Sequence, residues 1–176
     1  MIFVTAGSLK GFDRLVRAVD ELVDAGELDD EVFAQIGRGG YEPRRCTWQR
    51  FLSQDEFKAR VEGSSLVLSH VGVGTILLAL EAGVPVVTLP RRAALGEHVN
   101  DHQLDTARQM EADGLALVAW EVGDLAGCIR RSRDFRPSRG TGQGDLVGTL
   151  RRDLTALGEG RWRRLRRRLG RQRPSS

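Results

Sequence analysis

The sequence of 176 residues predicts an α/β fold, a Rossmann-like parallel sheet with helices on both faces. Two observations predict it. Apolar segments of strand length alternate along the chain with segments of helical spacing, which is typical of repeated strand–helix units. The strands are apolar throughout rather than at every second residue, as expected for strands covered on both faces. A chain of this length forms one domain with a substantial core.

The first part of the chain predicts two strands and two helices. Residues 2–5 are a buried strand closed by Gly7 and Ser8, and a helix follows from Phe12, with its core side formed by Leu15, Val16, Val19, Leu22 and Val23. A second strand is expected at residues 32–36, whereas the turn formers in residues 38–48 exclude a regular element there. A helix begins at Ser53, because Ser53 and Glu56 have the spacing of a capping box.

The next part continues the alternation. Residues 65–70 predict a third strand, and the apolar helix after it ends at Gly83, which Pro85 follows in the usual order for a helix end. Residues 84–90 predict a fourth strand and residues 115–120 a fifth. Between them, residues 100–110 predict a helix that turns three side chains toward the core, those of Leu104, Ala107 and Met110.

The pattern fails beyond Arg130, so we expect a folded domain at residues 1–130 and a basic linker and arginine-rich tail at residues 131–176. Residues 1–129 contain 12 basic and 20 acidic side chains, whereas residues 130–176 contain 15 arginines and 4 acidic residues. Near the end, Trp162, Leu165 and Leu169 have the spacing of a short amphipathic helix. We expect this tail to bind an anionic membrane surface, and a solvated, disordered tail is the alternative. We expect no nucleic-acid binding, because no aromatic stacking platform accompanies the arginines.

Two further features limit the classes of protein that are consistent with the sequence. The apolar stretches are shorter than the roughly 20 residues that cross a bilayer, so we expect a cytoplasmic protein. Cys46 and Cys128 lie far apart and outside any CxxC pair, which indicates neither a disulfide framework nor a cysteine metal site.

A glycine-containing loop, His70 to Thr75, lies between the third strand and the apolar helix. In an open parallel sheet, ligands bind at the carboxyl ends of strands, where helix N-termini favour phosphate. Gly72 and Gly74 lack Cβ atoms, so their backbone amides can approach a diphosphate. Thr75 offers a hydroxyl and His70 a donor. A tight turn without a ligand is the alternative, because the G-x-G spacing alone has low specificity.

Polar residues crowd the corresponding position one strand–helix unit later. Asn100, Asp101, His102 and Gln103 are consecutive and follow the fourth strand. They open onto the same crevice, and their carboxylate and amide groups suit hydrogen bonds to sugar hydroxyls. The alternative is a helix N-cap with solvated neighbours.

Together these segments resemble the nucleotide-sugar-binding C-terminal domain of family 28 glycosyltransferases, the C-terminal half of the GT-B fold. The resemblance covers residues 1 to about 120 and rests on VTAGS, QIG, FLSQDEF, SHVGVGT, LALEAGVPVVTLPRR and GEHVNDHQ. The chain is similar, more narrowly, to the stand-alone small subunits of two-component transferases. These are the bacterial exopolysaccharide subunits of the PssE type and the cytosolic eukaryotic subunit that adds the second N-acetylglucosamine to dolichol-linked oligosaccharide.

The resemblance implies a role for each matching residue. His70 is the implied catalytic residue, because it stabilises the charge of the leaving diphosphate. The implied donor-binding residues are Gly7, Ser8, Gly72, Gly74, Thr75, Arg91, Asp101, His102 and Gln103, and Arg92 adds positive charge. Residues 48–52 match the segment that seats a uracil-type base. Leu78 departs from the family, which carries a glutamate for the ribose there, and Glu81 is the expected substitute.

The implied activity is that of an inverting hexosyltransferase without a cofactor. It transfers a sugar from a nucleotide-sugar, expected to be a UDP-sugar, to a lipid-linked acceptor in polysaccharide biosynthesis. The family's acceptor lobe, which usually holds the base, is not in this chain. A membrane-anchored partner of the PssD type must therefore supply it, which places the chain at the inner face of the membrane. A non-catalytic nucleotide-sugar-binding or regulatory subunit is the alternative.

Two other classes of protein are less consistent with the sequence. His98 and His102 have i, i+4 spacing beside Glu97 and Asp101, but no third metal ligand is evident, so we expect no metal site. A dinucleotide oxidoreductase would carry G-x-G-x-x-G after its first strand, and residues 6–11 read AGSLKG.

Overall fold

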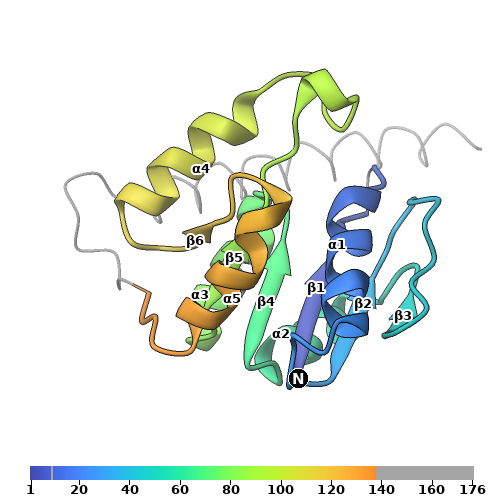
Figure 1. Cartoon of the computed structure of the whole chain (residues 1–176). Helices are drawn as coiled ribbons and strands as arrows, with labels where there is room; N and C mark the ends of the chain where they lie inside the picture. Colours follow the sequence, from blue (N-terminus) through green and yellow to red (C-terminus); the bar gives the residue numbers. More distant parts are fainter. Residues whose placement is uncertain (9, 138–176) are drawn as a thin grey trace, which may run out of the picture. The chain divides into compact units, whose positions relative to one another are not determined.

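The computed structural model describes residues 1–8 and 10–137, which form a six-stranded sheet with neighbouring strands parallel (Figure 1). The strand order is β3-β2-β1-β4-β5-β6. The strands are β1 (Ile2–Thr5), β2 (Val32–Gln35), β3 (Thr47–Gln49), β4 (Leu66–Ser69), β5 (Val86–Thr88) and β6 (Leu117–Val118). This architecture confirms the predicted Rossmann-like α/β fold.

Helices cover both faces of the sheet, with α1 and α5 on one side and α2 and α3 on the other (Figure 1). The helices are α1 (Asp13–Asp24), α2 (Gln54–Glu62), α3 (Val73–Ala82), α4 (His102–Ala112) and α5 (Leu125–Ser132), and two short 3₁₀ turns are η1 (Ala93–Leu95) and η2 (Val122–Asp124). The capping box predicted at the start of α2 is present, because Ser53 and Glu56 bond to each other's backbone N–H groups. Gly83 ends α3 with φ +71, as the sequence predicts.

Alternate residues of each central strand pack into two apolar layers. On the side of α1 and α5, Val4 and Leu68 pack with helix residues such as Leu15 and Leu125. On the other face the ring of Phe3 meets that of Phe57 edge-on, with 5.3 Å between ring centroids. Burial on both faces explains why the strands are continuously apolar.

The order of the strands creates a switch point between β1 and β4. Thr5 of β1 is in register with Gln35 of β2 on one side and with Ser69 of β4 on the other. The chain passes from β1 to β2 in one direction and from β4 to β5 in the other. The loops after β1 and β4 therefore diverge at the carboxyl edge of the sheet, the usual ligand position in open α/β sheets.

One strand and one α-helix were not predicted from the sequence. The exclusion of regular structure from residues 38–48 was wrong at its end, because Thr47 and Trp48 belong to β3. This strand has only three residues at the sheet edge and shows no apolar run. Helix α5 buries Leu125, Cys128 and Ile129 and extends to Ser132, two residues past the expected domain boundary.

The predicted linker from residue 138 onward and the arginine-rich tail lie outside the described residues. In the described part of the chain, none of the helices combines the length and apolar composition needed to cross a membrane.

Candidate functional site

The ring of His70 lies between two glycines at the switch point. A Cβ atom on Gly7, in the loop after β1, would lie 2.7 Å from Cε1 of His70. A Cβ atom on Gly72, after β4, would lie 2.7 Å from Nε2. Both distances are too short for a real carbon contact, so each glycine is needed for the ring to occupy this position. The structure thus brings together three residues that the sequence assigns to one site.

His70 is a neutral imidazole near pH 7. Burial and the nearby positive charge of Arg91 lower its pKa to about 4, and the charge of His98 adds to the lowering, whereas the backbone carbonyl of Thr5 opposes it. Nδ1 has no hydrogen-bond partner of good geometry in the part of the chain that the structure describes. The structure therefore favours a neutral ring that donates one N–H.

The N-terminus of α3 lies at the carboxyl edge of the sheet, beside His70. Its N-cap is Gly72, which has no side chain to satisfy the first N–H groups. The N–H groups of Val73, Gly74 and Thr75 have no partner within the described residues, and the first bond of the helix runs from Ile76 N–H to the carbonyl of Gly72. A Cβ at Gly74 would meet no atom within 4 Å. Three free N–H groups and the helix dipole favour an anion such as a phosphate at this position.

The loop after β1 is held close to the strands beneath it. Gly7 has φ +75 and donates its N–H to Oγ1 of Thr5, 3.1 Å away. Thr5 in turn donates to Oε1 of Gln35 on β2 at 3.4 Å. A Cβ on Gly37 would lie 2.2 Å from the carbonyl oxygen of Gly7, so the loops after β1 and β2 touch through backbone. The predicted donor residue Ser8 is exposed next to this turn.

Arg91, predicted to contact the donor, is buried with only 4% of its surface exposed. Its terminal nitrogens donate to backbone carbonyl oxygens of Ala6 at 2.6 Å, Lys10 at 2.8 Å, Gly11 at 3.2 Å and Glu97 at 3.2 Å. Because these four bonds engage the terminal N–H groups, a role in positioning the loops explains the contacts better than direct binding of the donor.

Glu97 connects α1 to the segment after β5, a role that the sequence patterns do not reveal. Its carboxylate accepts from Nε of Arg14 at 2.8 Å and from Nη2 at 2.9 Å, a bidentate pair between α1 and the segment after β5. It also accepts the backbone N–H of Arg92 at 3.0 Å. The partners lie 83 positions apart in the sequence, so no local spacing could have identified the pair.

The three residues predicted to recognise the sugar have different surroundings. Oε1 of Gln103 accepts the backbone N–H of Arg91 at 3.1 Å, and the carboxylate of Asp101 accepts that of Ala93 at 2.9 Å. The side chain of His102 is exposed at the start of α4. Asp101 and Gln103 thus organise the segment after β5, and His102 is available to a ligand. Asp101 occupies the N-cap position of α4 but does not cap it with its side chain.

Glu81, the expected ribose contact, lies in the last turn of α3. It is seven residues beyond Gly74, about 10 Å along the helix axis at 1.5 Å per residue. Leu78 is half-buried one turn earlier. The helix geometry therefore separates Glu81 from the open N-terminus, and its assignment to the ribose stays a prediction.

The segment expected to seat the base, residues 48–52, comprises the end of β3 and the residues after it, at the same edge of the sheet. Backbone bonds attach it to the end of β2, because Ile36 and Gly37 donate to the carbonyls of Gln49 and Arg50 at 3.0 and 2.8 Å. Phe51 is 51% exposed, so its ring is available to stack on a planar group.

The residues of the alternative metal site are separated or already engaged. Helix α4 begins at His102, so His98 lies outside it and the two histidines do not share a helix face. Glu97 pairs with Arg14 and Asp101 with a backbone N–H. The described residues contain no group of three or more His, Cys, Asp and Glu side chains arranged to hold a metal ion.

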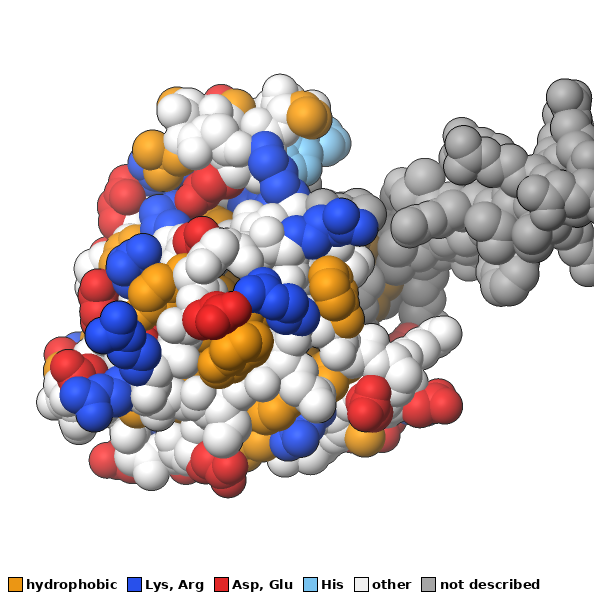
Figure 2. Space-filling view, turned by 90° about the vertical axis from the view of Figure 1, so that its right-hand side faces the viewer, with side chains coloured by type: hydrophobic (Ala, Val, Ile, Leu, Met, Phe, Trp, Pro, Cys, Tyr) orange, Lys and Arg blue, Asp and Glu red, His pale blue; other side chains and the backbone are white. Residues whose placement is uncertain are grey.

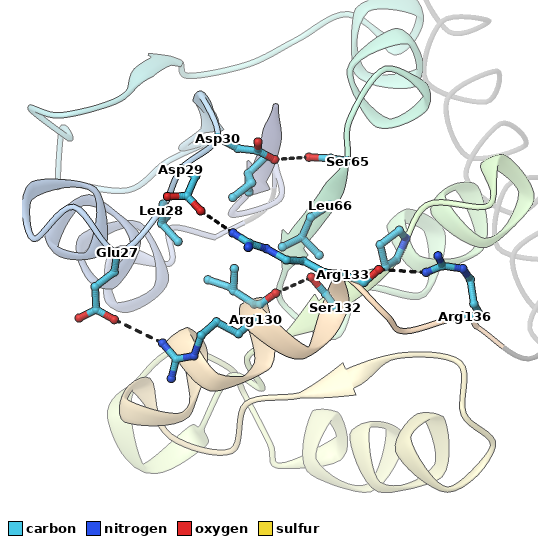
Figure 3. A pocket seen from close by; sticks show the side chains of 13 residues that line it. Glu27, Leu28, Asp29, Asp30, Ser65, Leu66, Arg130, Ser132, Arg133 and Arg136 are labelled. Atoms are coloured by element: carbon cyan, nitrogen blue, oxygen red, sulfur yellow. Dashed lines mark hydrogen bonds and ion pairs between the residues drawn. The ribbon is translucent and has the colours of Figure 1, made fainter.

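A separate pocket of about 320 Å³ lies at the opposite edge, by the amino ends of β1 and β4 (Figure 3). Arg133 reaches from the end of α5 to Asp29 at 2.6 Å, and Arg130 pairs with Glu27 at 3.7 Å. These pairs balance the charges around the pocket.

Figure 2 shows a histidine side chain near the top of the molecule, the side on which the strands end, with basic side chains close below it.

Sequence comparison assigns the chain to a family. A family model described as the glycosyltransferase family 28 C-terminal domain matches residues 1–133. The chain is 32% identical over 122 residues to the human UDP-N-acetylglucosamine transferase subunit ALG13, covering 64% of this chain and 10% of the human one. It is 29% identical over 167 residues to the subunit of that name from Eremothecium gossypii, covering 74% of this chain and 80% of the relative. The chain thus spans about a tenth of the human relative's length.

Solved glycosyltransferases share the fold. The glycotransferase of kitacinnamycin superposes with a TM-score of 0.55 at 22% identity, covering 88% of this chain and 39% of that chain. SnogD from Streptomyces nogalater superposes with a TM-score of 0.53 at 26% identity, covering 76% of this chain and 34% of that chain. The described fold is therefore one Rossmann-like half of a GT-B glycosyltransferase. From the match over residues 1–133, the chain belongs to the family of the glycosyltransferase family 28 C-terminal domain.

Proposed function

We propose that this chain is the donor-binding subunit of a two-component glycosyltransferase. It would bind a nucleotide-sugar, a UDP-sugar, whose hexose is transferred with inversion to a lipid-linked acceptor in exopolysaccharide synthesis of the PssE type. The observation that carries the proposal is the open N-terminus of α3, where three N–H groups lack partners beside the buried ring of His70. Relatives named as UDP-N-acetylglucosamine transferase subunits support the UDP-sugar.

In the proposed reaction, the acceptor hydroxyl attacks the anomeric carbon and the nucleoside diphosphate leaves. Negative charge then grows on the diphosphate. The N–H groups of Val73, Gly74 and Thr75 are aimed where that charge develops, and one well-placed donor of this kind contributes about 3–4 kcal/mol in known enzymes. The neutral ring of His70 donates a further N–H, and the hydroxyl of Thr75 is available for another hydrogen bond.

The reaction also needs an acceptor site and a base, which we assign to a partner subunit that supplies the second lobe. This chain corresponds to 34–39% of the two transferases described above, which supports the assignment. Leu95 and Val99 are 57% and 88% exposed in the segment between β5 and α4. We assign these two side chains to the surface that the partner covers.

We further propose that the complex lies at the cytoplasmic face of a membrane, anchored by a PssD-type partner and assisted by the basic tail. The test is sedimentation with anionic vesicles, comparing the full chain with a variant in which the eight arginines of residues 161–173 are glutamine. The proposal predicts that the wild-type chain pellets with the vesicles and the glutamine variant does not. Equal pelleting of the two would contradict the role of the tail.

A non-catalytic donor-binding subunit is a second candidate, favoured by Leu78 at the position where the family carries a glutamate. The two functions separate in an assay with UDP-sugars and a prenyl-diphosphate-linked acceptor. Turnover by the complex that requires His70 supports the catalytic subunit. Turnover that is unchanged in His70→Ala, with donor binding retained, supports the second function.

Donor binding itself is tested by thermal unfolding of the purified chain with UDP-, dTDP- and GDP-sugars. A ligand that binds only the folded state raises the melting temperature according to its affinity. The proposal predicts a rise with a UDP-sugar that is lost in His70→Ala. No rise with any of the three classes contradicts it.

A further inference from the structure

The guanidinium of Arg91 connects two loops at the carboxyl edge of the sheet. It donates to the carbonyls of Ala6, Lys10 and Gly11 in the loop after β1, and to that of Glu97 in the segment after β5. Its planar group also lies 4.9 Å from the ring centroid of Phe12. Arg91 makes four hydrogen bonds to carbonyls and is only 4% exposed. Its contacts therefore belong to the packed interior rather than to the surface.

We propose that Arg91 is a positioning residue of the donor site, whose guanidinium holds the loop after β1 so that Gly7 closes against the ring of His70. This inference rests on the proposed function and extends it, because it assigns the shape of the site to a residue that does not itself touch the donor.

The guanidinium of Arg91 bonds to the residue that precedes Gly7 in the chain. Its Nη2 bonds to the carbonyl of Ala6 at 2.6 Å, and Gly7, the next residue, is the one that approaches His70. Without the guanidinium, the buried carbonyls of this loop lose their donors, and a buried carbonyl without a donor is costly. The loop would then move to regain hydrogen bonds, and Gly7 would move with it.

The backbone of Arg91 extends the connection to a third segment. Its N–H donates to Oε1 of Gln103 at 3.1 Å, at the start of α4. One residue at the end of β5 therefore links the loop after β1, the segment after β5 and the helix whose first residues are predicted to recognise the sugar. A shift of Arg91 would therefore displace all three segments.

The charge of Arg91 also acts on His70. The charged groups that face the ring are Arg91 and His98, and both lower its pKa, together with burial as the largest cause, whereas the carbonyl of Thr5 opposes them. Glu97 opposes the lowering of the pKa of Arg91 by burial, which helps the guanidinium to keep its charge. The residue that makes the positioning contact thus also contributes to the neutral state of His70.

The test measures two properties of the full chain: the pKa of His70 by NMR titration without ligand, and the affinity for UDP-N-acetylglucosamine by calorimetry. Arg91→Met removes the hydrogen-bonding guanidinium and its charge, so we expect the pKa of His70 to rise above about 4, while burial, the largest cause of the lowering, still keeps it below 6.5. We expect the affinity to fall by about tenfold or more, as for a misplaced binding group. Arg91→Lys keeps the positive charge but cannot make the same set of hydrogen bonds. The pKa of His70 should therefore stay low while the affinity for UDP-N-acetylglucosamine falls.

Arg60→Met is the matched control, because Arg60 also lies over a phenylalanine, with 3.8 Å to the ring centroid of Phe33, but at the other end of the sheet. It should change neither property. Unchanged affinity and an unchanged pKa of His70 in folded Arg91→Met would overturn the proposal. If Arg91→Met does not fold, wild-type affinity in Arg91→Lys overturns it instead.

Different results would contradict the proposed function and this inference. If the wild-type chain does not bind the probe, the donor-binding function fails. The titration of His70 in the free protein still reports whether Arg91 acts on the ring, and an unchanged titration in Arg91→Met would overturn that part of the inference.

Discussion

Gly72 and His70 form one packed unit, because a Cβ atom on Gly72 would lie 2.7 Å from Nε2 of the imidazole. The backbone of Gly72 has φ −99, which any residue adopts, so the contact with the ring is what excludes a side chain. The loop that forms the open end of α3 is therefore shaped around His70.

Gly72→Ala should displace the ring of His70 and weaken the site. We expect a loss of about 1–3 kcal/mol in the free energy of unfolding, the usual cost of overpacking a filled site, together with weaker binding of a UDP-sugar. Chemical denaturation and calorimetry measure the two effects. An alanine variant as stable as the wild type, with unchanged affinity, would show that the ring moves aside at no cost.

Gly74→Ala should have opposite effects on stability and on binding. A Cβ there meets nothing within 4 Å in the free protein, and alanine is favoured over glycine in a helix by up to about 1 kcal/mol. We expect a slightly more stable protein that binds the donor more weakly, because the methyl group occupies space in front of the free N–H groups.

Gly127→Ala is the control for this effect, because Gly127 in α5 is also open to an added Cβ. It should stabilise the protein without changing donor affinity. Tighter or equal donor binding by Gly74→Ala would argue against a phosphate at this helix end.

The titration of His70 predicts how stability depends on pH. Its folded pKa of about 4 lies below the usual 6.5, so between these values the unfolded chain binds a proton that the folded chain does not. The free energy of unfolding should therefore decrease as pH falls from 6.5 to 4, by up to about 3 kcal/mol.

His70→Gln should lose this part of the pH dependence. The buried carboxylate of Asp20 acts in a different window. Burial tends to raise its pKa, but N–H bonds from Arg44 and Arg45 and the hydroxyl of Tyr41 hold it below 3.8, so its stabilisation is lost only at more acid pH. Denaturation curves at several pH values measure the difference between wild type and variant. Parallel pH profiles between 4 and 6.5 would contradict a depressed pKa at His70.

Glu97→Gln should loosen the segment after β5. The variant removes the charge that pairs with Arg14, whose side chain and that of Glu97 are 18% and 11% exposed. We expect a loss of about 2–3 kcal/mol in the free energy of unfolding, below the cost of breaking a fully buried pair. Glu62→Gln removes one member of an exposed pair with Lys58 and should cost less than about 0.5 kcal/mol. Equal stability of the two variants would show that the Arg14–Glu97 pair does not anchor the segment.

Val99→Asp should weaken binding to the partner subunit while donor affinity stays at the wild-type value. Val99 is 88% exposed, so a charged side chain there costs the free protein little. Placed in an interface it would be desolvated without a partner, which is strongly unfavourable. Titration of the two subunits measures the effect, and unchanged association would place the interface elsewhere.

Local patterns in the sequence predicted most of the fold. Continuous apolar runs identified five of the six strands, and Ser53 with Glu56 and Gly83 marked helix ends that the structure places at the same residues. The three-residue strand β3 is too short to show a period, so it could not be recognised. The candidate site was placed at the carboxyl edge because the carboxyl ends of parallel strands share one edge.

Long-range contacts explain what the sequence could not predict at the site. Arg91 follows a strand and carries a charge, which suggests a phosphate contact, yet its guanidinium is engaged by carbonyls about 80 positions earlier in the chain. The pair of Arg14 with Glu97 spans a similar distance. The neutral state of His70 depends on burial, which no local motif specifies.

The central claim is that the open N-terminus of α3 holds the diphosphate of a nucleotide-sugar. A crystal structure of the chain with UDP-N-acetylglucosamine tests it most directly. The account predicts phosphate oxygens within hydrogen-bond distance of the N–H groups of Val73, Gly74 and Thr75, with the ring of His70 beside them. A bound donor whose diphosphate lies away from these N–H groups would contradict the account.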